Sequence, residues 1–124
     1  MIAVLQRYIE QFIILSPEEL DALGKFIEIR TYDKRVKLTD VGDTEEYLHF
    51  VVKGLVRKYF YKGKEEIITQ LAQEGDLVSS SISFLSGNAS GYVVETIEPT
   101  TCYSLYKGNV EFLYSKYPNL ERLS

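Results

Sequence analysis

Residues 75–91 hold the side chains that could most readily form a ligand site. The segment opens with Gly75–Asp76, and five serines follow: Ser79, Ser80, Ser81, Ser83 and Ser90. Serine hydroxyls donate and accept hydrogen bonds, so this cluster could bind a small or uncharged ligand. Serine is also a common cap and turn residue, so the same cluster could surround an empty pocket. Both interpretations, a ligand site and an empty pocket, stay open. A catalytic serine is not predicted, because the sequence has no nucleophile-elbow motif.

Other residue patterns do not predict an enzyme. A cupin-type metal site needs two or three histidines with a carboxylate, and His49 is the only histidine, so we interpret it as a structural or surface residue. The acid pairs Asp40–Asp43 and Glu65–Glu66 lie at expected turns, where carboxylates are normally solvated. The glycine-rich turns lack the Walker lysine arrangement. We therefore predict no catalytic residue, no metal and no cofactor.

Charge and cysteine content narrow the classes of partner. The formal net charge is −4 and the 14 Lys and Arg residues are scattered, with no basic cluster longer than a pair such as Arg57–Lys58. Because non-specific DNA affinity needs clustered basic residues, we do not expect this chain to hold DNA by itself. Cys102 is the only cysteine, and we expect it to be a small buried residue. No apolar run reaches about 18 residues and no signal-peptide layout is present, so we expect a cytoplasmic protein without a membrane partner.

Two helices are expected before the middle of the chain. Apolar residues recur at a spacing of three to four in residues 2–13, which predicts the first helix. A second helix starts at Ser16–Pro17, where serine can cap, proline suits the first helical position and Glu19 can close a capping box. This helix is expected to end near Glu28, where the pattern changes to alternation.

Regularly spaced turn glycines divide the middle of the chain into strands. They stand 12, 9, 12 and 12 residues apart: Gly42, Gly54, Gly63, Gly75 and Gly87. Runs rich in β-branched and aromatic residues predict strands at 28–32, 36–39, 47–52, 55–61, 66–72, 92–97 and 101–106. Turns at intervals of about 8–12 residues are typical of a small all-β sandwich or barrel.

Helical patterns return at the end of the chain. Asn109 is expected to cap a third helix, which Pro118 ends. Residues 119–123 have the pattern of the first turn of a fourth helix, and a helix this short is not stable alone. We expect the sequence to be part of a longer protein.

The order of these segments resembles the cyclic-nucleotide-binding domain of bacterial Crp/Fnr-type transcription regulators. The matching segments are VGD (41–43), LHFVVKGLVR (48–57), QEGDL (73–77), SFL (83–85), VVETIE (93–98) and FLYSKYPNL (112–120). The resemblance covers nearly the whole chain and implies a mainly β fold with flanking helices, a double-stranded β-helix or jelly-roll-like β-roll. It predicts one domain with N-terminal helices at 1–28, the roll at 29–106 and C-terminal helices at 107–124.

The resemblance further implies a regulatory role. In such regulators a long helix starting after the position of Pro118 pairs two subunits, and a helix-turn-helix domain reads DNA. This sequence stops where that helix would start, so it is expected to be the effector-sensing part. The expected partners are a small-molecule effector, a second copy in the full-length protein, and DNA only through the helix-turn-helix domain that this chain lacks.

The resemblance also implies where a cyclic nucleotide would bind. Binders carry a Gly-Glu pair after the Gly-Asp turn and an Arg-Ser or Arg-Thr pair later; the helix start and the arginine hold the cyclic phosphate, and the glutamate bonds the ribose hydroxyl. Here the first pair falls on Ser79–Ser80 and the second near Ala89–Ser90 or Ser90–Gly91, so the acid and the arginine are missing. The short helix is expected to remain, capped by a serine and ended by Gly87.

This degenerate cassette predicts weak binding of cyclic AMP. Losing the arginine contact costs several kcal/mol, since one hydrogen bond to a charged group contributes about 1.5–3 kcal/mol. Arg57 or Lys58 could substitute, although a solvated surface position is the expectation for both. The alternatives are a stand-alone β-roll that binds a small ligand or presents its tyrosines to a protein partner and, as the weakest, a cupin-type metal enzyme.

Overall fold

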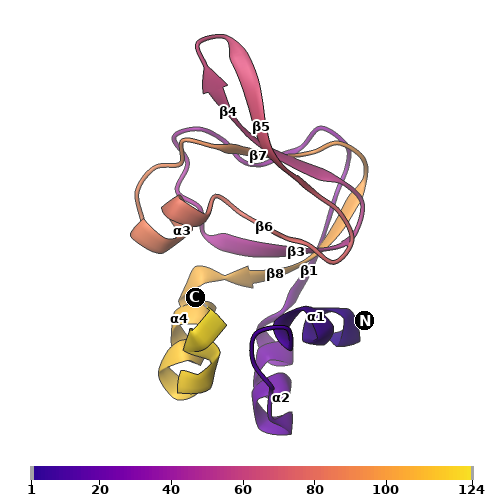
Figure 1. Cartoon of the computed structure of the whole chain (residues 1–124), viewed down its shortest axis with the longest axis vertical. Coiled ribbons are helices and arrows are strands. Elements are labelled where there is room, and N and C mark those ends of the chain that lie inside the picture. Colours follow the sequence, from indigo (N-terminus) through magenta and orange to yellow (C-terminus); the bar gives the residue numbers. More distant parts are fainter. Residues whose placement is uncertain (1, 124) are drawn as a thin grey trace.

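Two four-stranded antiparallel sheets form a roll, with the N-terminal and C-terminal helices gathered below one of them (Figure 1). The computed structural model describes residues 2–123. One sheet has the order β1–β8–β3–β6 and the other the order β2–β7–β4–β5. The strands are β1 (Glu28–Tyr32), β2 (Lys37–Thr39), β3 (Tyr47–Lys53), β4 (Val56–Lys62), β5 (Glu65–Ala72), β6 (Leu77–Val78), β7 (Val93–Thr96) and β8 (Thr100–Tyr106). The predicted β-roll with flanking helices is confirmed, and only the short β6 lies outside the predicted strands.

The helices differ from prediction at two boundaries. They are α1 (Ile2–Ile9), α2 (Pro17–Phe26), α3 (Ser81–Ser86), α4 (Lys107–Lys116) and the 3₁₀ helix η1 (Pro118–Leu123). The first helix ends at Ile9 and not at residue 13, because the chain turns there and directs Ile13 and Leu15 into the core. The helix expected to follow an Asn109 cap is α4, and it starts at Lys107. The Lys107 N–H donates to the Glu46 carbonyl at 2.8 Å, so the backbone satisfies the first donor without an asparagine cap.

The start of α2 carries the capping box expected from the sequence. The Glu19 N–H donates to the Ser16 hydroxyl at 3.1 Å, and the Ser16 N–H donates to the Glu19 carboxylate at 2.8 Å. The same carboxylate accepts a bond from the Asn119 amide at 3.3 Å, which ties α2 to η1. These bonds hold the pKa of Glu19 below its usual value, with the Ser16 backbone N–H as the main cause.

Replacing Ser16 by alanine is expected to lower the free energy of unfolding by about 1 kcal/mol, because the Glu19 N–H loses its acceptor. Urea unfolding of both proteins measures the difference. Ser81→Ala is the matched control, since this exposed serine makes no side-chain hydrogen bond among the described residues. An equal change in the two variants would contradict a capping contribution.

Glycine is required where β3 turns into β4. Gly54 has a φ of +116°, and a Cβ there would lie 2.4 Å from the Thr100 Oγ1 and 2.7 Å from the Pro99 carbonyl oxygen. The turn therefore presses directly against the start of β8. This contact packs the β3–β4 turn against Pro99 and Thr100, where β8 begins.

The apolar residues form two clusters on opposite faces of the sheet β1–β8–β3–β6. The outer cluster joins this sheet to α1, α2, α4 and η1, and includes Leu5, Leu23, Phe50, Tyr103, Leu113 and Leu120. The inner cluster fills the roll and includes Val51, Val56, Ala72, Val78, Val94 and Cys102. Cys102 is fully buried as predicted, and burial raises the pKa of its thiol to about 11. In the described part of the chain, no helix has both the length and the apolar character needed to cross a membrane.

Candidate functional site

The segment predicted to bind a ligand folds as a turn, a short strand and a short helix. Gly75 has a φ of +93°, and the Asp76 carboxylate accepts the Gln73 N–H at 2.9 Å. β6 then pairs with β3, and α3 follows at the side of the roll (Figure 1). The expected end of this helix is confirmed, because Gly87 adopts the left-handed conformation and donates its N–H to the Ser83 carbonyl. The backbone of the cassette is thus retained.

The buried serine hydroxyls bond to the protein itself. The Ser80 and Ser90 hydroxyls lie 2.6 Å apart, and the Ser90 hydroxyl also lies 2.8 Å from the Tyr92 carbonyl oxygen and 3.0 Å from its nitrogen. The Ser83 hydroxyl donates to the Asn88 carbonyl at 2.5 Å. Ser79 is also buried, whereas Ser81 and Ala89 are exposed. The prediction that a serine side chain caps α3 is wrong: Ser80 occupies the cap position, but its hydroxyl points to Ser90.

A carboxylate that the sequence analysis did not single out reaches this segment. Glu45 is 3% exposed, and its Oε1 accepts the Ser80 backbone N–H at 2.9 Å. Its Oε2 accepts the Thr39 hydroxyl at 2.8 Å, and its own N–H donates to the Ser83 hydroxyl at 2.9 Å. Glu45 therefore joins β2 to both ends of the segment 80–83. It thus places a carboxylate at the backbone N–H of the residue that precedes α3.

No local signal in the sequence points to this position. Glu45 and Ser80 lie 35 residues apart, and an acidic pair between a turn and a strand usually faces solvent. Among the described residues Glu45 has no ion-pair partner within 4 Å. Burial raises the pKa of its carboxyl group, while the bonds from Ser80 and Thr39 partly offset that rise.

The two candidate auxiliary cations take different positions. The Arg57 guanidinium bonds the Glu95 carboxylate at 2.7 Å and the Glu66 carboxylate at 3.2 Å, so it is already paired. The Lys58 ammonium lies 4.8 Å from the Tyr92 ring centroid. Burial lowers the pKa of Lys58, and the Glu45 charge opposes that shift. Lys58 is thus the cation of the pair that interacts electrostatically with Glu45.

Beside Glu45, a polar cavity of about 500 Å³ lies between β2, the second half of β1 and the start of β3. Its wall includes Arg30, whose guanidinium lies 4.3 Å from the Tyr47 ring centroid, and the buried His49. The His49 Nδ1 lies 2.8 Å from the Ser104 Oγ. Burial and, less strongly, the Arg30 charge lower the pKa of His49 to about 4. In the described part of the chain no group of three His, Cys, Asp or Glu side chains is arranged to hold a metal ion.

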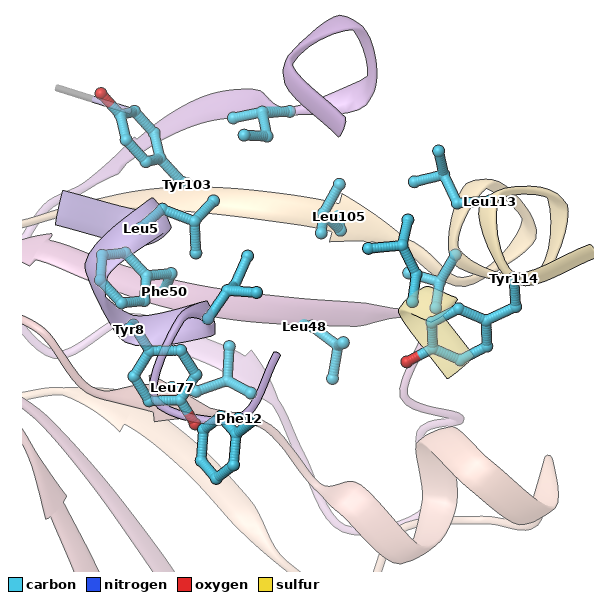
Figure 2. A pocket seen from close by; sticks show the side chains of 14 residues that line it. Leu5, Tyr8, Phe12, Leu48, Phe50, Leu77, Tyr103, Leu105, Leu113 and Tyr114 are labelled. Atoms are coloured by element: carbon cyan, nitrogen blue, oxygen red, sulfur yellow. The ribbon is translucent and has the colours of Figure 1, made fainter. Parts of the chain in front are cut away.

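A second cavity has an entirely different lining. It has a volume of about 140 Å³ and lies between the outer face of β3 and β8 and the helices α1 and α4. Figure 2 shows Leu5 and Tyr8 from α1, Leu48 from β3, Leu105 from β8 and Leu113 from α4 directed into the same space. All the side chains that line this cavity are aliphatic or aromatic. We call it the apolar cavity below.

Comparison with known proteins agrees with this architecture. The family model described as "Cyclic nucleotide-binding domain" matches residues 29–117. No curated protein sequence gives a significant match.

Solved structures with the same fold come from several bacteria. A cyclic nucleotide-binding domain from Methylobacillus flagellatus has a TM-score of 0.84 at 17% identity, covering 98% of this chain and 70% of that chain. The sensor domain of the transcriptional regulator DNR from Pseudomonas aeruginosa has a TM-score of 0.79 at 16% identity, covering 96% and 79%. The catabolite activator protein from Thermus thermophilus has a TM-score of 0.79 at 24% identity, covering 90% of this chain and 53% of that chain. This chain therefore spans about half the length of the Thermus protein.

Proposed function

Because the chain belongs to the cyclic nucleotide-binding domain family, we propose that it is the effector-sensing domain of a Crp/Fnr-like bacterial transcription regulator whose cassette does not bind cyclic AMP tightly. The proposed role is that of a sensor of a small molecule and not of an enzyme. The proposal includes a homodimer in the full-length protein, a cytoplasmic location, and contact with DNA through a separate helix-turn-helix domain.

The observation that carries the proposal is the Glu45 carboxylate bonded to the Ser80 N–H at 2.9 Å. A cyclic phosphate placed at this N–H would meet a like charge, and the segment 79–91 contains no arginine to offset it. The Ser80 and Ser90 hydroxyls, which lie where the acid and the arginine pair would be, already bond each other. Together these contacts disfavour an anionic ligand in the cassette.

Sensing requires an effector that binds two states of the domain with different affinity. The elements that could differ between states are α1, α4 and η1, because they are attached to the roll through apolar side chains of the outer cluster. In the proposed regulator, movement of these helices would change the placement of the following segments. The Glu45 charge also acts on Lys58, since it opposes the lowering of the Lys58 pKa by burial.

Calorimetric titration of the chain with cyclic AMP is expected to give a Kd weaker than about 100 μM, because two or more charged hydrogen bonds of about 1.5–3 kcal/mol each are missing. The triple variant Glu45→Gln, Ser80→Glu, Ala89→Arg restores the missing groups and removes the internal carboxylate. It is expected to bind at least tenfold more tightly. A micromolar Kd for the unmodified chain would contradict the proposal.

A further inference from the structure

We propose that the apolar cavity of Figure 2 is a binding site for a small, uncharged, apolar molecule that contacts the roll and the flanking helices at the same time. A molecule bound there would be the effector of the sensing domain proposed above, so its regulatory meaning rests on that proposed function. Of the segment 75–91, only Leu77 lines the cavity, and none of the serines of the cassette does.

The chemistry of the wall selects the ligand class. The only polar side-chain atoms among the lining residues are the hydroxyls of Tyr8, Tyr103 and Tyr114. A buried water usually needs two to four polar partners, so a wall of this kind favours an apolar occupant over water. Neither a positive nor a negative side chain lines the cavity, and an ion would lose its hydration there without compensation.

The size of the cavity sets the scale of the ligand. Its volume is about 140 Å³. Apolar cavities of about 150 Å³ in other proteins stay dry and accept benzene or xenon. Phe12 lies at the wall with 60% of its surface exposed, so the cavity reaches solvent beside it. A ligand of about six heavy atoms therefore fits, with a route of entry past Phe12.

The position of the cavity connects occupancy with the placement of the helices. Leu5 comes from α1, Leu48 from β3, and Val110 and Leu113 from α4, and all four line the cavity. A change in the separation of helix and sheet would change the volume of the cavity. An occupant therefore binds more tightly to the arrangement whose cavity matches its size. A two-state sensor requires such a difference in affinity between its two conformations.

The test uses benzene as the probe and pyrazine as a polar ring of the same shape. Methyl NMR titration of the chain is expected to show saturable shifts at Leu48, Leu105 and Leu113, with benzene binding at least tenfold more tightly than pyrazine. A near-saturating benzene concentration is expected to raise the Tm by about 3 °C. Shifts that do not saturate, or equal affinity for the two rings, would overturn the proposal.

Two variants localise the binding. Leu48→Phe narrows the cavity and is expected to weaken benzene binding at least tenfold, whereas Leu71→Phe makes the same change at a residue of β5 that is 55% exposed and is expected to leave it unchanged. Should Leu48→Phe fail to fold, Leu113→Ala enlarges the cavity and is expected to admit toluene at least as tightly as benzene. Unchanged benzene binding in Leu48→Phe, or exclusion of toluene by Leu113→Ala, would place the probe elsewhere. Because the serines of the cassette do not line the apolar cavity, tight binding of cyclic AMP would refute the proposed function and leave this result intact.

Discussion

Replacing Glu45 by alanine is expected to lower the free energy of unfolding by about 3 kcal/mol. The side chain accepts one bond from the Ser80 N–H and one from the Thr39 hydroxyl, and both partners are buried. Each hydrogen bond to a charged acceptor contributes about 1.5–3 kcal/mol, and removing the buried charge recovers part of its desolvation cost. The net loss therefore falls near the lower end of the sum. Urea unfolding at pH 7 measures it.

Two matched variants show which property of Glu45 stabilises the protein. The first removes the charge and keeps the shape of the side chain, and the second removes a neighbouring acid that is exposed. Glu45→Gln keeps the shape and one acceptor oxygen for the Ser80 N–H, while its amide NH2 can donate to the Thr39 hydroxyl, and it is expected to cost about 1 kcal/mol. Glu46→Ala removes the neighbouring acid, which is exposed, and is expected to change stability by less than about 0.5 kcal/mol. In Glu45→Ala, hydrogen exchange at the Ser80 amide should also become faster. A loss no larger than that of Glu46→Ala would show that the carboxylate does not hold the segment.

Acidification is expected to destabilise the protein by about 3 kcal/mol through His49 alone. Burial, assisted by the Arg30 charge, lowers the pKa of His49 from 6.5 to about 4 in the folded state. Between these values the unfolded chain binds more protons than the folded one, so stability falls as the pH falls. The contribution is fully present above pH about 6.5 and is lost at about 1.4 kcal/mol per pH unit down to pH about 4.

The variant His49→Gln isolates this dependence. Glutamine keeps a polar group near Ser104, whose hydroxyl lies 2.8 Å from the His49 Nδ1, but it does not titrate. The Glu45 carboxyl group acts in the opposite direction: its pKa is raised in the folded state, so its contribution falls as the pH rises through the folded pKa. The free energy of unfolding is measured for wild type and variant from pH 4 to 7. Subtracting the two curves cancels the titration of Glu45, which both proteins share. A difference independent of pH would contradict a neutral, buried His49.

Both groups take part in the same region of the roll. His49 and Glu45 line the polar cavity together with Arg30 and Tyr47. Protonation of His49 would place a second positive charge beside Arg30 in a setting that already disfavours the charged imidazole. The interior of the roll is therefore organised around a neutral histidine and a carboxylate held by hydrogen bonds, which differs from the arginine-centred cassette of a cyclic-nucleotide binder.

Local residue patterns were sufficient to predict most of the fold. The capping box at Ser16 and the hairpin turn at Gly63 each depend on residues a few positions apart. Alternation and turn glycines placed the longer strands within one or two residues of their observed ends. The two wrong helix boundaries share one cause, because α1 and α4 are limited by contacts with other parts of the chain. The Lys107 N–H, for example, is satisfied by Glu46.

The sequence by itself determined the β-roll and the loss of the charged residues from the cassette, since a missing arginine is visible in any linear comparison. Only the tertiary structure decided what occupies that place. Glu45 reaches Ser80 across 35 residues and His49 reaches Ser104 across 55, and the apolar cavity is lined by residues of α1, β3, β6, β8, α4 and η1. Such contacts depend on how the two sheets and the helices pack against one another. The positions that the elements take in this packing cannot be deduced from any short stretch of residues.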